Sequence, residues 1–153
     1  MKRPAAKGTF SMTSEAGELV RLRKWLREEL EGHGVPRPDQ SNLLLAVGEL
    51  CNNSIQHAYE GQSGKPIRVS VRSSDEALTI EVEDFGKPFD AEQYEAPNLE
   101  TVPDHGYGLF LVKTIADNLS VDIARERGTR WTIVKYRPGR GPAVGTKDGV
   151  SRS

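Results

Sequence analysis

Two runs of alternating apolar and polar residues, joined by a short polar segment, restrict the fold of this chain more than any other feature. The apolar members of the two runs are Ile67, Val69, Val71, Leu78, Ile80 and Val82. A period of two is typical of strands with one buried face, and the polar residues 73–76 between the runs predict a turn. The sequence therefore predicts an antiparallel β-hairpin, which does not suit a doubly wound parallel sheet.

Apolar residues at helical spacing mark three further segments. The apolar positions of the first are Leu19, Leu22, Trp25, Leu26 and Leu30. Ser14 is a candidate N-cap for this helix, and Gly32 and Gly34 are expected to end it. After Pro36 and Pro38 we expect a second helix from about Asp39 to about Tyr59, and later an apolar third helix at 108–118.

Two more strands are expected near the end of the chain, one around Val121 and Ile123 and the other over Thr129–Tyr136, joined at Arg127 and Gly128. Helices combined with hairpins predict an α+β fold, a two-layer α/β sandwich with the helices on one face of a mostly antiparallel sheet.

The length of 153 residues fits one domain. We expect this domain to cover residues 9–137. Residues 1–8 are small and basic, and residues 138–153 are rich in Gly, Pro, Ser and charge without an apolar period, so both segments are expected to be disordered tails.

Charge and composition exclude several classes of function. With 21 basic and 22 acidic residues the net charge is -1, which leaves no basic excess for direct binding of nucleic acid. No apolar run approaches the roughly 18 residues of a membrane span, and the N-terminus lacks a signal-peptide core. A single cysteine, Cys51, provides neither a disulfide framework nor a thiolate metal cluster. We expect a cytoplasmic protein.

The second helix places polar residues together opposite its apolar side. The apolar side comprises Leu43, Val47, Leu50, Cys51, Ile55 and Ala58, and the polar side Glu49, Asn52, Asn53 and Gln56, with His57 at its edge. One interpretation is an ordinary amphipathic helix that faces water. However, adjacent asparagines are poor helix formers. Glu49 and Asn53, one turn apart, could instead provide a base beside a ligand for a hard cation such as Mg²⁺.

The end of the hairpin carries a second candidate. Asp84 continues the parity of Val82 and therefore points toward the apolar layer, where an unpaired carboxylate is costly. Phe85 and Gly86 then turn the chain. Either Asp84 is already rotated into solvent, or it accepts a hydrogen bond from a ligand amine, as adenine recognition requires.

The segment Gly106-Tyr107-Gly108-Leu109-Phe110-Leu111 opens the third helix. Glycines at a helix start expose backbone N–H groups that can bind phosphate oxygens. The alternative is an ordinary turn. The spacing matches neither a Rossmann fingerprint nor a Walker A loop.

Taken in order, these segments resemble the motifs of the GHKL ATPase superfamily. Residues 45–59 resemble its N box, Asp84-x-Gly86 its first glycine box, Gly106-x-Gly108 its second, and Arg127-Gly128-Thr129 its closing glycine-threonine element. The similarity covers about residues 19–136 and is closest to the small branch of anti-sigma-factor serine/threonine kinases, which are RsbW-like and SpoIIAB-like. It implies the Bergerat fold.

The resemblance also implies roles for individual residues. Glu49 would be the general base, Asn53 would coordinate Mg²⁺, and Asp84 would bind the adenine amino group of ATP, with Gly86 and Thr129 beside the base. The phosphates would lie against Gly106, Tyr107, Gly108 and Leu109, under a lid of roughly Ala91–His105. His57 and Phe110 complete the residues expected at the nucleotide.

The resemblance further implies a homodimer that sequesters a sigma factor and uses Mg-ATP to phosphorylate a serine on a STAS-type anti-anti-sigma protein. An alternative is a non-catalytic nucleotide-binding module with the same partners. A metalloenzyme built on Glu49 and His57 lacks a third ligand. Arg21, Arg23 and Arg27 of the first helix form either a solvated face or part of the partner surface.

Overall fold

The computed structural model describes residues 6–90, 107–123 and 127–141. Within these ranges the strands are β1 (Ala6–Thr13), β2 (Pro66–Ser73), β3 (Ala77–Asp84), β4 (Asn118–Asp122) and β5 (Thr129–Tyr136). The helices are α1 (Glu18–Gly32), α2 (Arg37–Asn53) and α3 (Tyr107–Ile115), and α2 continues directly into a π-helical segment, η1 (Ser54–Ala58). Among the described residues, no helix is long and apolar enough to cross a membrane.

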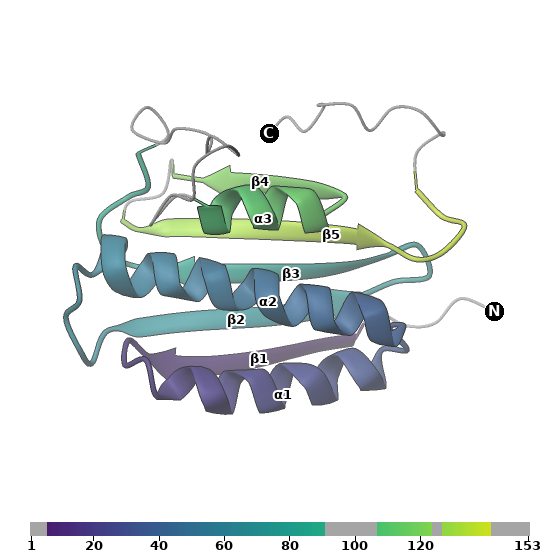
Figure 1. Ribbon diagram of the computed structural model, residues 1–153, viewed down its shortest axis with the longest axis horizontal. Helices are drawn as coiled ribbons and strands as arrows, with labels where there is room; N and C mark the ends of the chain where they lie inside the picture. Colours follow the sequence, from purple (N-terminus) through teal and green to yellow (C-terminus); the bar gives the residue numbers. More distant parts are fainter. Residues whose placement is uncertain (1–5, 91–106, 124–126, 142–153) are drawn as a thin grey trace.

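The strands form one sheet in the order β1-β2-β3-β5-β4, and all four neighbouring pairs are antiparallel. The predicted hairpin is β2 with β3, where Val71 faces Ile80 and Val69 faces Val82. Its turn is closed by Ser74, whose backbone N–H donates to the Ala77 carbonyl. The three α-helices lie on one face of this sheet, with α2 between α1 and α3 (Figure 1). The predicted α+β sandwich is therefore confirmed.

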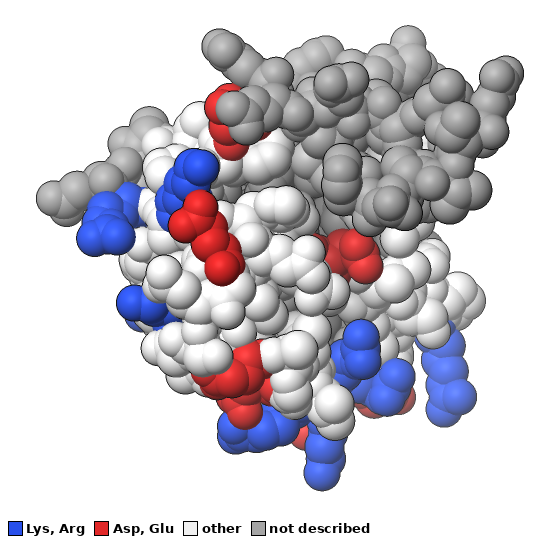
Figure 2. Space-filling model, turned by 60° about the vertical axis from the view of Figure 1, so that its left-hand side comes forward, with Lys and Arg blue, Asp and Glu red and all other residues white. Residues whose placement is uncertain are grey.

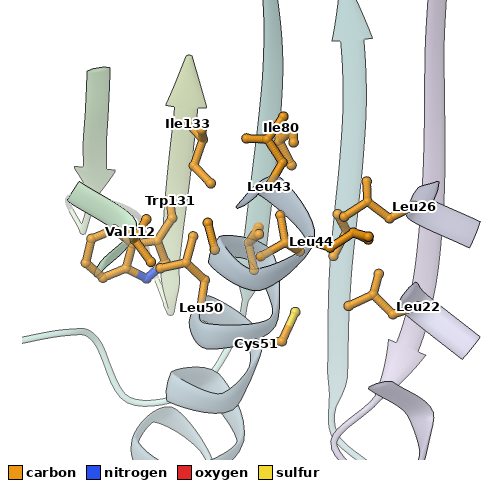
Figure 3. Packing of buried hydrophobic residues seen from close by; sticks show 14 of the residues in the cluster. Leu22, Leu26, Leu43, Leu44, Leu50, Cys51, Ile80, Val112, Trp131 and Ile133 are labelled. Carbon is orange, nitrogen blue, oxygen red and sulfur yellow. The ribbon is translucent and has the colours of Figure 1, made fainter. Parts of the chain in front are cut away.

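The core lies between α2 and the sheet, because the apolar side chains of every strand alternate toward the helices. Leucines of α2 meet isoleucines of β3 and β5, while α1 closes one side of the layer and α3 the other (Figure 3). The labelled members of this cluster are Leu22, Leu26, Leu43, Leu44, Leu50, Cys51, Ile80, Val112, Trp131 and Ile133.

The opposite face of the sheet carries polar side chains. Arg68 on β2 pairs with Glu83 on β3 at 3.3 Å, and Arg130 on β5 pairs with Asp122 on β4 at 3.4 Å. Ion pairs this exposed contribute at most about 1 kcal/mol each. Burial of the helix-covered face therefore dominates the stability of the sheet.

Strand β1 was not predicted, and it begins inside the segment that we expected to be a tail. Residues 6–8 belong to this strand, whereas residues 1–5 lie outside the described part of the chain. Its apolar alternation is short, with Met12 buried and Phe10 stacked on Trp25 at 5.4 Å between ring centroids. At the other end, residues 138–141 of the expected C-terminal tail are described and include a turn, in which the Arg140 N–H donates to the Arg137 carbonyl.

The predicted cap of the first helix was wrong. Helix α1 begins after Gly17, which makes no side-chain cap. Ser14 instead bridges two segments: its hydroxyl donates to the Gln62 carbonyl at 2.5 Å and accepts from the Lys65 N–H at 3.0 Å. It therefore fixes the end of β1 to the loop that precedes β2.

Three predicted boundaries also shift. Helix α2 begins at Arg37 rather than at Asp39, because Pro36 takes the N-cap position and Pro38 fits the first turn. Helix α3 ends at Ile115 rather than Asn118, since Asn118 already belongs to β4. Ile123 lies just beyond β4 and is exposed.

The central position of α2 predicts unequal effects for two neighbouring leucines. Leu43 is 0% exposed and Leu45 is 48% exposed. We expect Leu43→Ala to lower the free energy of unfolding by about 2–5 kcal/mol, because it leaves a cavity under α2. The matched control Leu45→Ala should stay within about 0.5 kcal/mol of wild type. Urea denaturation followed by circular dichroism measures both, and equal losses would contradict this packing.

Candidate functional site

The predicted site residues within the described ranges meet at one end of the sandwich, where α2 passes into η1, β3 ends and β5 begins. This is the left-hand end of the molecule in Figure 1, and α3 also starts there. Seen from this side, acidic and basic side chains are interspersed over the described surface (Figure 2). That mixture agrees with the nearly neutral net charge of the whole chain.

Asp84 is the last residue of β3 and is buried, with 2% of its surface exposed. The interpretation in which it is rotated into solvent is therefore wrong. Its Oδ2 accepts a hydrogen bond of 2.7 Å from the Ser54 hydroxyl, and its Oδ1 accepts one of 3.1 Å from the Gly86 N–H. The carboxylate is thus held between η1 and the turn that follows β3.

The charge of Asp84 also acts on its surroundings. Burial, and to a lesser degree the negative charge of Asp84, raises the pKa of the Cys51 thiol to about 12. Cys51 therefore stays protonated at neutral pH, and it is a packing residue rather than a reactive thiol.

The turn after β3 packs tightly on the end of η1. A Cβ on Gly86 would overlap the carbonyl oxygen of Ala58, so no other residue fits here without a shift of the backbone. The next residue, Lys87, donates its backbone N–H to the same carbonyl at 2.8 Å.

The Tyr59 hydroxyl also holds the turn that follows β3. Its hydroxyl donates to the Pro66 carbonyl at 2.6 Å and accepts from the Phe85 N–H at 2.7 Å. Burial raises the pKa of the Tyr59 phenol, which keeps it a neutral donor. The position of Gly86 is therefore determined by η1 and by the start of β2 together.

The closing element lies directly beside Asp84. Thr129 is the residue opposite Asp84 in the β3–β5 ladder, and its buried hydroxyl accepts a 2.9 Å hydrogen bond from the Phe89 N–H. The preceding Gly128 has φ of 85°, and a Cβ there would overlap the Asp84 carbonyl oxygen. Glycine is therefore required at this point of close approach.

Glu49 lies at the start of α3. A Cβ on Gly108 would overlap a carboxylate oxygen of Glu49, so the two residues are in direct contact. The first N–H groups of an α-helix have no partner within the helix and carry partial positive charge. The half-buried Glu49 carboxylate therefore lies at the positive end of α3, and half-buried Asn53 is one turn further along α2. This arrangement differs from a plain water-facing helix surface.

The remaining predicted residues differ in how far they are exposed and in whether they lie within the described ranges. His57 lies on η1 with an exposed side chain, and Phe110 on α3 is half-buried. The side chain of Leu109 belongs to the core, so a ligand could contact this residue through its backbone. Tyr107 is the first residue of α3, whereas Gly106 and the expected lid, residues 91–105, lie outside the described residues.

The sequence did not predict η1 or the role of Ser54. We expected an unbroken helix to Tyr59, but α2 ends at Asn53 and the N–H of Tyr59 bonds to the carbonyl of Ser54, five residues back. Ser54 itself could have been found, because it follows Leu50 and Cys51 at the i+4 and i+3 spacing of the apolar side. A polar residue on a buried helix face requires a partner.

Comparison with known proteins identifies the relatives of this chain. The family model of the histidine kinase-like ATPase domain matches residues 12–135. The chain is 34% identical over 105 residues to the serine-protein kinase RsbW of Bacillus pumilus, covering 62% of this chain and 64% of that protein. It is 35% identical over 99 residues to the anti-sigma F factor of Clostridium botulinum, covering 62% of this chain and 69% of that protein.

A solved structure gives independent support for the fold. The crystal structure of the RsbU and RsbW domains of Rv1364c from Mycobacterium tuberculosis matches with a TM-score of 0.64 and 19% identity, over 90% of this chain and 35% of that one. This chain therefore belongs to the histidine kinase-like ATPase domain family, among relatives that include RsbW serine-protein kinases and anti-sigma F factors.

Proposed function

We propose that this chain is an ATP-binding anti-sigma factor that uses Mg-ATP to phosphorylate a serine on a STAS-type anti-anti-sigma protein. The observation that carries the proposal is the pair of carboxylates, Asp84 and Glu49, at one end of the sandwich. Asp84 is buried and held by Ser54, and Glu49 lies against the first turn of α3. Asp84 can recognise the adenine base, and Glu49 can serve a reaction at the phosphates.

The site fits an adenine nucleotide at its Asp84 end. An ionised carboxylate is an acceptor, so it pairs with the amino group of adenine. Gly86 and Gly128 hold the backbone closer to Ala58 and Asp84 than a side chain would allow, and Thr129 stands beside Asp84 on the next strand. These contacts support a ligand that meets Asp84 where the ends of β3 and η1 and the start of β5 converge.

The α3 end fits phosphate groups and a hard cation. The N–H groups at the start of α3 lie at the positive end of the helix and suit phosphate oxygens, and the amide oxygen of Asn53 suits Mg²⁺. Among the described residues, no group of three His, Cys, Asp or Glu side chains could hold a metal by itself. The proposed cation is shared between Asn53 and the nucleotide. When bound, Mg²⁺ would neutralise charge on the phosphate oxygens.

Glu49 is the proposed general base. As the partner's serine oxygen forms a bond to the γ-phosphorus and the bond to ADP breaks, the Glu49 carboxylate accepts the serine proton. The contact with Gly108 supports this role because it keeps the carboxylate beside the expected phosphate position. The names of the relatives support a sigma factor as the second partner, and a homodimer remains part of the proposal.

Replacing the buried carboxylate tests nucleotide binding. We expect Asp84→Asn to weaken ATP binding at least about tenfold, since the amide presents a donor group to the adenine amine. Calorimetric titration with and without Mg²⁺ measures the affinity. The control Asp122→Asn removes a carboxylate from β4, on the other face of the sheet, and should leave ATP affinity unchanged. A wild-type chain that binds no ATP would refute the proposal.

Replacing the proposed base separates catalysis from binding. We expect Glu49→Gln to lower phosphorylation of a STAS partner by about 10²–10⁴-fold, a typical contribution of general base catalysis, with ATP affinity within about twofold of wild type. Transfer of radiolabelled phosphate measures the rate. If the wild-type chain bound Mg-ATP but transferred no phosphate to its STAS partner, a non-catalytic binding module would be the better description.

The arginines of α1 provide a test of partner binding. The Arg21 side chain is 67% exposed, pairs with Glu18 and lies 5.8 Å from the centroid of the Phe10 ring. We expect Arg21→Glu with Arg23→Glu to weaken capture of sigma factor or STAS protein, because both side chains are exposed on α1.

ATP affinity should not change in this double variant, since α1 lies apart from the end of β3. The control Arg72→Glu reverses a charge on β2, on the uncovered face of the sheet, and should affect neither measurement. Surface plasmon resonance with each partner, beside calorimetry with ATP, distinguishes the cases. Loss of both activities, or of neither, would count against this surface.

A further inference from the structure

The hydrogen bond between Ser54 and Asp84 connects the helix layer to the proposed base-binding end of the site. Both residues are 2% exposed, and the Ser54 hydroxyl is 2.7 Å from Asp84 Oδ2. A serine hydroxyl has one proton to donate. In this bond Ser54 is therefore the donor and the carboxylate is the acceptor.

The last turn of α2 places this hydroxyl, because the Ser54 N–H still bonds to the Leu50 carbonyl four residues back. Ser54 is the first residue of η1, directly after the last residue of α2, and its carbonyl accepts the five-residue hydrogen bond from Tyr59. Gly61 makes an even wider bond, from its N–H to the Ile55 carbonyl at 2.8 Å. Ser54 therefore lies against the end of β3, and the wider turns that follow it lead to Tyr59, which reaches the turn at Phe85.

The carboxylate is held at both oxygens by neutral donors from opposite sides. Ser54 donates to Oδ2 from the helix layer, and the Gly86 N–H donates to Oδ1 from the turn. Two donors at two different oxygens fix the plane of the group as well as its position. A carboxylate fixed in this way remains an acceptor toward a ligand.

We infer that Ser54 is a positioning residue that sets the purine selectivity of this site. It holds Asp84 in the orientation that accepts from a 6-amino group, and the same orientation rejects a 6-carbonyl, whose oxygen would face another acceptor. A site built to pair with a ligand N–H discriminates strongly against an analogue that lacks it. This inference rests on the proposed function, because it assumes that Asp84 contacts the base.

A purely structural role for Ser54 makes a different prediction. If Ser54 merely satisfied a buried carboxylate, its loss would destabilise the fold and weaken every nucleotide equally. If Ser54 orients Asp84 toward the amino group, its loss should weaken ligands that carry this group and spare those that do not. Three probes separate these cases: ATP, inosine triphosphate with a 6-carbonyl, and purine riboside triphosphate with neither group.

The test is calorimetric titration of wild type and Ser54→Ala with the three nucleotides. We expect Ser54→Ala to weaken ATP about tenfold, an effect of the size expected for one hydrogen bond to a charged group. Binding of purine riboside triphosphate should change less than about twofold, and the preference for ATP over inosine triphosphate should fall. Equal weakening of ATP and purine riboside triphosphate, or no weakening of either, would overturn the inference.

Further variants keep the result clear if Ser54→Ala folds poorly. Ser54→Thr retains a hydroxyl donor and should keep the wild-type preference for ATP, whereas Ser54→Cys keeps the size but offers a weak donor and should lose it. The matched control is Ser73→Ala, which removes a buried serine hydroxyl bonded to His33 Nδ1 at 2.6 Å. It should change thermal stability but not nucleotide preference.

The outcomes for the two proposals can be told apart. If wild type bound none of the three nucleotides, the proposed function would fail and the inference with it. If wild type preferred ATP and Ser54→Ala kept that preference unchanged, the inference alone would fail. The rise in melting temperature on adding each nucleotide gives a second readout of the same preferences.

Discussion

The packing of α2 across the middle of the sheet is the contact on which the rest of this structure depends. Leu43 and Leu50 are fully buried against β3 and β5, and α1 and α3 close the two sides of the helix. Because the sheet, α1 and α3 each pack against α2, only a narrow part of the helix surface is left for Glu49 and Asn53. Burial of one side of α2 therefore determines where the polar chemistry on its other side can lie.

Much of this architecture was predictable because the buried positions are periodic. The alternation that ends in Val82 carries Asp84 to the covered face, and the bounds of β5 follow from its own alternation and from Gly128. Strand β1 escaped prediction because its few apolar residues are a weak signal against small and polar neighbours. Its place in the sheet depends on pairing with β2, more than fifty residues away, which no local pattern encodes.

The site was predictable in its members but not in its contacts. Glu49, Asn53, Asp84 and Thr129 were chosen from residue type, parity and motif order, and the fold brings them to one end of the sandwich. The Ser54 hydrogen bond depends on where the end of β3 meets the end of α2. The π-helical widening that follows Ser54 accompanies a distant contact, because one hydroxyl of Tyr59 reaches Pro66 and Phe85. Long-range contacts of this kind override the local preference for an α-helix.

The π-helical segment also links the number of residues in α2 and η1 to the orientation of the site residues. A π-turn amounts to an α-helix that holds one extra residue, so the segment Ser54–Ala58 has one residue more than the same span of α-helix would need. The packing of α2 sets the orientation of the residues before this segment, and the contacts with the turn at Gly86 set the orientation of the residues after it. Loss of one residue from this segment would leave a regular α-helix whose two ends face as before, whereas a deletion elsewhere in α2 would turn the two halves of the site about 100° apart. Outside the π-helical segment, the two halves can therefore diverge by substitution, but scarcely by insertion or deletion.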